Sequence, residues 1–327
     1  MSVLHHPVLL NEVLHALNLK AGQTVIDCTI GAGGHAEHIL KVISPSSPLK
    51  GNGWGGVMSP AGKLLGLDTD DNALEITTQC LKPYGSHVCL RHANFAQLER
   101  IAVEENFTSA HAILADLGVS SMQLDNAERG FSFQIDGTLD MRMNPSQGQS
   151  ATKLVNTISE KALADIIYHY GEERKSRQIA KAIVKARPIY TTLELADVVS
   201  RIVGKHHRQR IHPATRTFMA IRIAVNDELT NLEKFLPQAI NLLAPLGRLA
   251  IITFHSLEDR PVKHFFQQEA KACICPPRLP ICACNHQATI RIITRKPITA
   301  TEQEIMNNPR ARSAKLRVVE RKGVQKV

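Results

Sequence analysis

The sequence predicts an α/β fold, with a doubly wound, mostly parallel sheet of seven strands and an inserted all-helical subdomain. Two observations predict it. Short β-branched or apolar runs alternate with helical patterns from about residue 23 to residue 115, as they do in βαβ units. Only helical patterns fill 127–225, and a strand pattern resumes at 247. Apolar residues make up 43% of the 327 residues, which is enough for a sizeable core.

The strands of the sheet are predicted from short runs rich in Val, Ile, Leu and Ala. They are 24–28, 63–67, 87–91, 110–115, 247–254, 289–295 and 314–320. The helices between and after them are predicted at 34–43, 71–82, 95–105 and 258–271. Because no crossover helix of the usual length separates the last two strands, we expect them to form an antiparallel hairpin at the sheet edge.

The helical insertion is predicted from its start and stop signals. Ser159 can cap one helix, and Thr191 with Glu194 forms a capping box for another, which Gly204 can end. Pro213 fits the first turn of the next helix. We therefore predict one domain formed by residues 1–126 and 226–327, and an inserted helical subdomain at 127–225.

A second, shorter insertion is predicted inside the first domain. Residues 44–62 are mostly Ser, Pro and Gly and contain the only tryptophan of the chain. This composition is typical of a flexible surface segment.

The formal net charge of +9 is concentrated in a few stretches. Residues 201–222 carry six basic side chains and no acidic one: Arg201, Lys205, Arg208, Arg210, Arg216 and Arg222. Such a stretch suits a polyanionic partner such as RNA, because each neutralised phosphate releases counterions. A solvated basic face without a partner is the alternative.

The seven cysteines indicate a reducing compartment. Four of them, Cys273, Cys275, Cys282 and Cys284, form a C-x-C-x6-C-x-C pattern. Structural zinc sites usually have C-x2-C spacing, so we predict four reduced loop cysteines and no metal, with a zinc clip as the alternative. The start of the chain has no export signal, and no apolar run reaches the length of a bilayer span. We therefore expect a cytoplasmic protein without a membrane partner.

The strongest motif is the glycine turn DCTIGAGGH at 27–35, between the first strand and its helix. Glycines let the backbone turn sharply and approach a ligand closely. The pattern also fits a dinucleotide site. The acidic Asp27, four residues before Gly31, instead favours a methyltransferase, and Asp68 at the end of the second strand can accept hydrogen bonds from both hydroxyls of a ribose.

A second motif, DLGVSSMQL at 116–124, follows the fourth strand. Ligands of doubly wound sheets bind beyond the carboxyl ends of the strands, so we expect Asp116 to lie at the cofactor crevice. Amino-group methyltransferases often have an Asp- or Asn-led loop at this place, because acceptors for the amine N–H groups help the nitrogen to attack. The Pro-Pro-aromatic continuation of DNA amino-methyltransferases is absent.

Together these motifs resemble one family, the bacterial methyltransferases that modify N4 of a cytidine in 16S ribosomal RNA. The resemblance also includes Glu12 and several further segments along nearly the whole chain. These are HPVLL (6–10), ERGFSF (128–133), LDMRM (139–143), YGEE (170–173), HPATR (212–216), FHSLEDR (254–260) and NPRARS (308–313). The 44–62 insertion departs from the pattern of the family.

The resemblance implies a class I, Rossmann-like methyltransferase fold with S-adenosyl-L-methionine as cofactor. It implies that the cofactor is bound by Gly33, Gly34, His35, Asp68, Phe95, Asp116 and Gln123. It further implies that the substrate is the cytidine at position 1402, in the usual numbering of 16S rRNA, in the decoding centre of the small ribosomal subunit. A homodimer is one arrangement that the resemblance allows.

We predict that Asp116, Asp140, Arg142 and His255 are the catalytic residues. Each has an alternative interpretation: Asp140 and Arg142 can form an ion pair that supports a loop, and a lone histidine is often a structural hydrogen-bonding group. Phe131 and Phe133 can stack on a flipped cytosine or can pack in a core. Two other functions stay open, a methyltransferase acting on DNA or protein and a non-catalytic RNA-binding or assembly factor.

Overall fold

The computed structural model of the chain describes residues 7–45, 61–204, 212–275, 282–284 and 286–323. The chain forms two compact units, Met1–Gly118 with Asn231–Val327, and Val119–Thr230. We predicted the divisions at 126/127 and 225/226, whereas the units divide at 118/119 and 230/231. The first division lies earlier because Val119 and Leu124 pack against the core of the second unit.

The first unit contains one seven-stranded sheet in the order β3-β2-β1-β4-β5-β7-β6. Its strands are β1 (Thr24–Asp27), β2 (Lys63–Asp68), β3 (Val88–His92), β4 (Ala110–Asp116), β5 (Leu243–Thr253), β6 (Ile290–Ile292) and β7 (Lys315–Arg321). The first five pair in parallel, and β7 runs antiparallel to both β5 and β6. The predicted sheet and its antiparallel end are confirmed, and the doubly wound topology is Rossmann-like.

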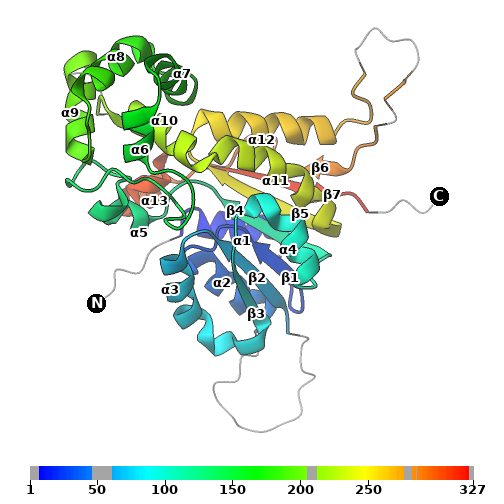
Figure 1. Cartoon of the computed structure of the whole chain (residues 1–327). Coiled ribbons are helices and arrows are strands. Elements are labelled where there is room, and N and C mark those ends of the chain that lie inside the picture. Colours follow the sequence, from blue (N-terminus) through cyan, green and yellow to red (C-terminus); the bar gives the residue numbers. More distant parts are fainter. Residues whose placement is uncertain (1–6, 46–60, 205–211, 276–281, 285, 324–327) are drawn as a thin grey trace, which may run out of the picture. The chain divides into compact units, whose positions relative to one another are not determined.

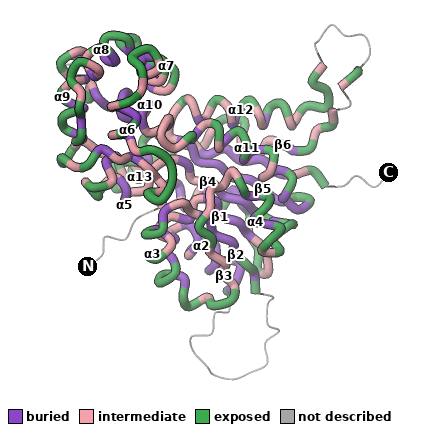
Figure 2. The backbone as a smooth tube through the Cα atoms, viewed as in Figure 1, coloured by how far each residue is buried: buried purple, intermediate pink, exposed green. Residues whose placement is uncertain are grey.

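Helices cover both faces of this sheet because successive strand residues point to opposite sides. Val25 and Leu64 belong to one apolar cluster, and their neighbours Ile26 and Leu65 belong to the other. The first face is covered by α1 (Leu10–Leu17), α2 (Gly34–Ile43) and α3 (Asp71–Leu81), and the second by α4 (Leu98–Glu104), α11 (Glu228–Leu242) and α12 (Ser256–Glu269). Figures 1 and 2 show this layering and the buried strands.

Some elements of the first unit differ from the prediction. The helix expected at 95–105 begins with a 3-10 turn, η2 (Phe95–Gln97). The helices α1, α11 and α13 (Glu302–Asn307) were not predicted. In α11 the interior Pro237 obscures the pattern, but Phe235 and Leu236 are buried in the core and stabilise the helix. A fully buried side chain of this size contributes about 1.5–3 kcal/mol.

The second unit is mainly helical, and it has its own apolar core. Its helices are α5 (Ser121–Asp125), η3 (Ala127–Arg129), α6 (Ala151–Thr157), α7 (Glu160–Gly171), α8 (Ser176–Ala186), α9 (Thr192–Val203) and α10 (Thr215–Asn226). Ser159 caps α7, and the predicted capping box opens α9. Two expectations are wrong. Pro213 lies in a turn before α10, and residues 130–150 are irregular, held in part by a β-bridge between Thr138 and Thr191.

Most of the predicted insertion, 46–60, lies outside the described residues. Its two described ends lie together, because Ser44 Oγ donates to the carbonyl of Gly62 at 3.1 Å and Gly62 N–H donates to the carbonyl of Ile43 at 2.9 Å. The two described ends of the insertion thus lie next to each other, between α2 and β2. Across the described parts of the chain, no helix has the length and apolarity to cross a membrane.

Candidate functional site

The glycine turn connects β1 to α2 through two residues in the left-handed region, Gly31 (φ 53°) and Gly33 (φ 83°). A Cβ added at Gly33 would lie 3.3 Å from Thr77, and one added at Gly34 would lie 3.1 Å from Pro7. At Gly31 the nearest atom would be 3.9 Å away. The turn is therefore packed on one side and open at Gly31, as a backbone cradle for a ligand requires.

The carboxylate of Asp68, at the end of β2, holds this turn. Its Oδ2 accepts the N–H of Gly31 at 2.9 Å, and its Oδ1 accepts the N–H of Asp70 at the same distance. Each carboxylate oxygen can accept more than one hydrogen bond, so capacity for ribose hydroxyls remains. Asp68 thus holds the backbone of the turn, and the same carboxylate is the group that we predicted to bind a ribose.

Three carboxylates lie at the same edge of the sheet, because Asp27, Asp68 and Asp116 end the strands β1, β2 and β4. Burial, with the charge of Asp68 adding to it, raises the pKa of Asp27 to about 7. Burial also raises the pKa of Asp116 well above its usual range, and the charges of Asp27 and Glu258 raise it further. An uncompensated acidic edge favours a cationic ligand.

The charge of this edge separates the two ligands that the glycine turn left open. S-adenosyl-L-methionine carries a positive sulfonium and a positive ammonium group. A dinucleotide carries a negative pyrophosphate, which would oppose the ionisation of Asp27 and Asp116 further. The edge therefore fits the sulfonium donor, and the dinucleotide alternative is disfavoured.

His35, in the first turn of α2, is buried beside this edge. Its Nε2 lies 3.0 Å from the carbonyl oxygen of Val8. Because a carbonyl only accepts hydrogen bonds, Nε2 carries the hydrogen. Its Nδ1 lies 3.9 Å from Oδ2 of Asp116. The ring is thus fixed between the N-terminal segment and the carboxylate at the end of β4.

Asp116 is anchored through its backbone, which leaves its side chain with acceptor capacity. Its N–H donates to Oγ1 of Thr29 at 2.7 Å. Its Oδ1 is buried and has no hydrogen-bond partner among the described residues. A buried acceptor without a partner costs about 1–3 kcal/mol, so a donor group of a ligand would be favoured there.

Phe95 and His255 follow β3 and β5, whose carboxyl ends lie at the same sheet edge. The ring of Phe95 packs edge-to-face on Phe235, with centroids 5.3 Å apart. His255 Nε2 lies 3.1 Å from Oε1 of Glu258, whose Oε2 accepts the N–H of Phe254 at 2.9 Å. The buried Glu258 thus orients the His255 ring, and the catalytic role of His255 stays a prediction.

Glu258 and Thr29 are site residues that the motif analysis did not single out. Glu258 lies within FHSLEDR (254–260), three residues after the histidine that flanks the start of α12. A carboxylate at that spacing commonly reaches back to the backbone before a helix, so this spacing was the signal that could have found it.

Gln123, Asp140 and Arg142 belong to the second unit. Gln123 and Ser120 form a capping box that opens α5, with Gln123 Oε1 accepting the N–H of Ser120 at 3.0 Å. The Arg142 guanidinium pairs with both oxygens of Asp140, at 2.7 Å from Nη2 to Oδ2 and 3.0 Å from Nε to Oδ1. The ion-pair interpretation of Asp140 and Arg142 fits this geometry, and their contact with a base stays a prediction.

The two phenylalanines after the Asp116 loop pack within the second unit. Phe133 lies edge-to-face on Phe218, with centroids 4.7 Å apart, and also 4.6 Å from the ring of His212. Phe131 is 7% exposed and carries Arg129 over its ring at 5.8 Å. This packing favours the core interpretation over stacking on a flipped base.

The basic side chains of the stretch 201–222 differ in their exposure. Arg222 makes a bidentate pair with Glu228 at 2.8 and 2.9 Å and is 16% exposed. This pairing favours a structural role for Arg222 over contact with RNA. Arg216 lies 3.8 Å from Glu173, and Arg201 is exposed on α9. The predicted cations Lys205, Arg208 and Arg210 lie outside the described residues.

The similarity of this chain to known proteins extends over nearly its whole length. A protein of Dehalococcoides mccartyi named ribosomal RNA small subunit methyltransferase H is 50% identical over 97% of this chain and 86% of its own. Proteins with the same name are 49% identical in Syntrophotalea carbinolica, over 97% of this chain and 98% of theirs, and 46% identical in Carboxydothermus hydrogenoformans, over 98% and 99%.

A family model described as the MraW methylase family matches residues 2–322. The match covers both units and all the motifs discussed above. The chain is a methyltransferase, its methyl donor is S-adenosyl-L-methionine, and it belongs to the MraW methylase family.

Proposed function

We propose that this chain methylates N4 of a cytidine in 16S ribosomal RNA, at position 1402 in the usual numbering, in the decoding centre of the small ribosomal subunit. The observation that carries the proposal is Asp116, a carboxylate at the end of β4 whose buried Oδ1 lacks a hydrogen-bond partner among the described residues. The names of the relatives support the substrate class. The cytoplasm, where such subunits are found, is the proposed location.

The cofactor site is proposed at the glycine turn. The backbone of Gly33 and Gly34 approaches the methionine part, His35 bounds the pocket next to Asp116, and Asp68 accepts the ribose hydroxyls. Phe95 lies beside the adenine, and Asp116 and Gln123 each contribute a further contact to the cofactor, as the resemblance to the family implies. When bound, S-adenosyl-L-methionine supplies an electrophilic methyl group on a positively charged sulfur.

Asp116 is proposed to prepare the target amine. The lone pair of a cytosine amine is delocalised into the ring, so the nitrogen is a poor nucleophile. An acceptor that holds an amine N–H helps to turn the lone pair out of the ring plane and aligns it for attack. An ionised Asp116 is the stronger acceptor, and in the free protein its raised pKa opposes ionisation. A positive charge bound near Asp116 lowers this pKa, so donor binding also prepares the acceptor.

Asp140, Arg142 and His255 are proposed to hold the target nucleotide. The guanidinium of Arg142, fixed by Asp140, suits a base edge or a phosphate. His255, fixed by Glu258, supplies a second positioned hydrogen-bonding group. No dedicated base is needed, since the methylated ammonium is acidic enough to lose its proton to water.

The experiment that tests the proposal is radiolabelled methyl transfer to small ribosomal subunits that lack the modification. Label in a single cytidine of 16S RNA supports it. Label only in DNA or protein, or no label with any substrate, overturns it in favour of the two alternatives stated from the sequence. The variant Asp116→Ala removes the proposed acceptor, and Asp165→Asn, an exposed position on α7, is the control. We expect label to be lost with the first and kept with the second.

A further inference from the structure

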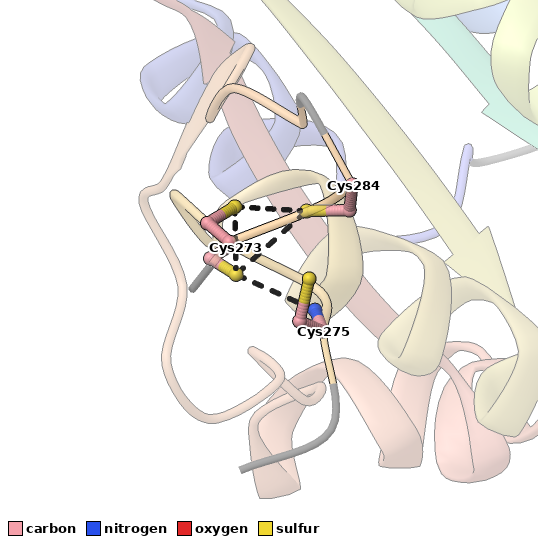
Figure 3. A group of neighbouring side chains, drawn as sticks. Cys273, Cys275 and Cys284 are labelled. Carbon is pink, nitrogen blue, oxygen red and sulfur yellow. Dashed lines mark hydrogen bonds between the residues drawn. The ribbon is translucent and has the colours of Figure 1, made fainter. Parts of the chain in front are cut away.

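The four clustered cysteines lie between the end of α12 and the start of β6, and Figure 3 labels three of them, Cys273, Cys275 and Cys284. The Sγ atom of Cys273 lies 3.5 Å from that of Cys282 and 3.7 Å from that of Cys284, and the last two are 3.6 Å apart. All four Sγ atoms, including that of Cys275, lie within 4.8 Å of one another. None of the four is in a disulfide.

These distances fit a single tetrahedral metal ion. With Zn–S bonds of about 2.3 Å, tetrahedral geometry places neighbouring sulfurs about 3.8 Å apart. Cys273, Cys282 and Cys284 already form a triangle with nearly such edges, and Cys275 is within reach of the fourth corner. Four thiolate ligands in a tetrahedral arrangement favour zinc over the harder divalent metals, which prefer oxygen ligands.

Backbone N–H groups point at these sulfurs, as they do around metal-bound thiolates. The N–H of Cys275 donates to Sγ of Cys273 at 3.4 Å, and that of Ala283 donates to Sγ of Cys275 at 3.4 Å. Such donors stabilise the negative charge that four thiolates carry, and this outer layer tunes a metal site.

Apolar burial does not explain the cluster, because Cys273 and Cys282 are exposed and the other two are half-buried. The base of the loop is held by hydrogen bonds. Thr289 N–H donates to the carbonyl of Glu269 at 3.0 Å, and the Thr289 hydroxyl donates to the carboxylate of the same Glu269 at 2.9 Å. This pinning brings the two C-x-C pairs face to face, which explains how the unusual spacing can still supply four ligands.

We propose that Cys273, Cys275, Cys282 and Cys284 bind one zinc ion as a tetrathiolate that clips the loop between α12 and β6. Four protein ligands close the coordination sphere, so the ion is structural and takes no part in methyl transfer. The proposal replaces our prediction of a metal-free loop, because that prediction rested on spacing alone.

The test is the metal content of the full chain, purified under reducing conditions without chelator. We expect about one zinc per chain by atomic emission. The double variant Cys273→Ser with Cys284→Ser should lose it, whereas Cys80→Ser, an exposed cysteine outside the cluster, should keep it. Absence of zinc from the protein as purified, together with no zinc uptake by the chelated and reduced wild type, overturns the proposal. Zinc that persists in the double variant, or iron as the bound ion, also overturns it.

Two further readouts do not depend on how the variants fold. Cobalt added to chelated wild-type protein should give the thiolate charge-transfer absorption of a tetrahedral site, and zinc should remove it. Chelation should speed trypsin cleavage after the exposed Lys271 by about tenfold, because the loop opens more often. The affinity for S-adenosyl-L-methionine should stay the same. If chelation leaves the rate of cleavage unchanged, the proposal that zinc clips this loop is refuted.

Discussion

Replacing Asp27 by asparagine tests whether the acidic sheet edge is held for a cationic ligand. Asp27 is 1% exposed, and its pKa is raised from 3.8 to about 7. One pKa unit corresponds to about 1.36 kcal/mol, so ionising Asp27 in the free protein costs about 4 kcal/mol. The side-chain amide of the variant can still accept the N–H of Thr29, which the aspartate accepts at 3.2 Å, and it never ionises.

The sign of the effect follows from the raised pKa. The neutral carboxyl is favoured in the folded protein, so its contribution to stability is complete below pH 3.8 and is lost as the pH rises to about 7. We expect the free energy of unfolding of the wild type to fall by about 4 kcal/mol more than that of Asp27→Asn between pH 4 and pH 8.

The assay is urea unfolding of both proteins over this pH range, without donor and at fixed salt. The difference between the two proteins cancels all groups that they share. Asp165→Asn, an exposed position, is the control and should follow the wild type at every pH. Calorimetry with S-adenosyl-L-methionine completes the test. The affinity of the wild type should rise more steeply with pH than that of the variant as Asp27 ionises, because the variant keeps only the pH dependence of the groups that the two proteins share. The variant should also bind the donor more weakly above pH 7.

Parallel stability curves for the wild type and Asp27→Asn would refute the reasoning, because they would show that Asp27 has the same pKa in the folded and unfolded states. If the donor affinity falls with rising pH in the wild type alone, the inference that the acidic edge is held for a cationic ligand is refuted instead. The two results are independent, so the burial argument and the ligand argument can fail separately.

Four other predictions concern donor binding, stability and RNA binding. Asp68→Ala should weaken donor binding at least tenfold in calorimetry, since charged hydrogen bonds contribute about 1.5–3 kcal/mol each; unchanged affinity would remove Asp68 from the site. Gly33→Ala should cost about 1–2 kcal/mol of stability and should also weaken donor binding. Its control is Gly85→Ala, because φ is also positive at Gly85 but an added Cβ meets nothing within 4 Å there. Gly85→Ala should lower stability alone. Equal donor affinity in the two alanine variants would contradict the cradle. Arg222→Ala should lose about 3 kcal/mol of stability, because it leaves Glu228 buried without its partner. Arg201→Ala should instead lower the salt dependence of RNA binding by about one counterion, and an unchanged slope would exclude Arg201 from the interface.

Much of the fold could be predicted because its elements carry local signals. Each strand of the sheet is a short apolar run, and the starts of α7 and α9 are marked by capping residues within four positions of the helix. The helix α11 could not be predicted in this way. Its Pro237 is a helix-breaking signal, and only packing of Phe235 and Leu236 against the sheet overrides it.

The site residues divide along the same line. Glycines at Gly31 and Gly33 are local requirements of a turn, so the pattern of residue types was sufficient to find them. The pairing of Arg222 with Glu228 could not be predicted from the sequence. The sequence does not show whether a basic side chain faces solvent or a carboxylate.

By itself, then, the sequence determined which residues can turn, cap and pair within a few positions, and hence the order of strands and helices. Tertiary structure decided what depends on burial and on contacts between distant segments. It placed Asp27, Asp68 and Asp116 on one sheet edge and raised their pKa values by desolvation. It also brought Cys273 and Cys284 within 3.7 Å of each other. Desolvation and distance are properties of the assembled chain, since both depend on which segments surround a group.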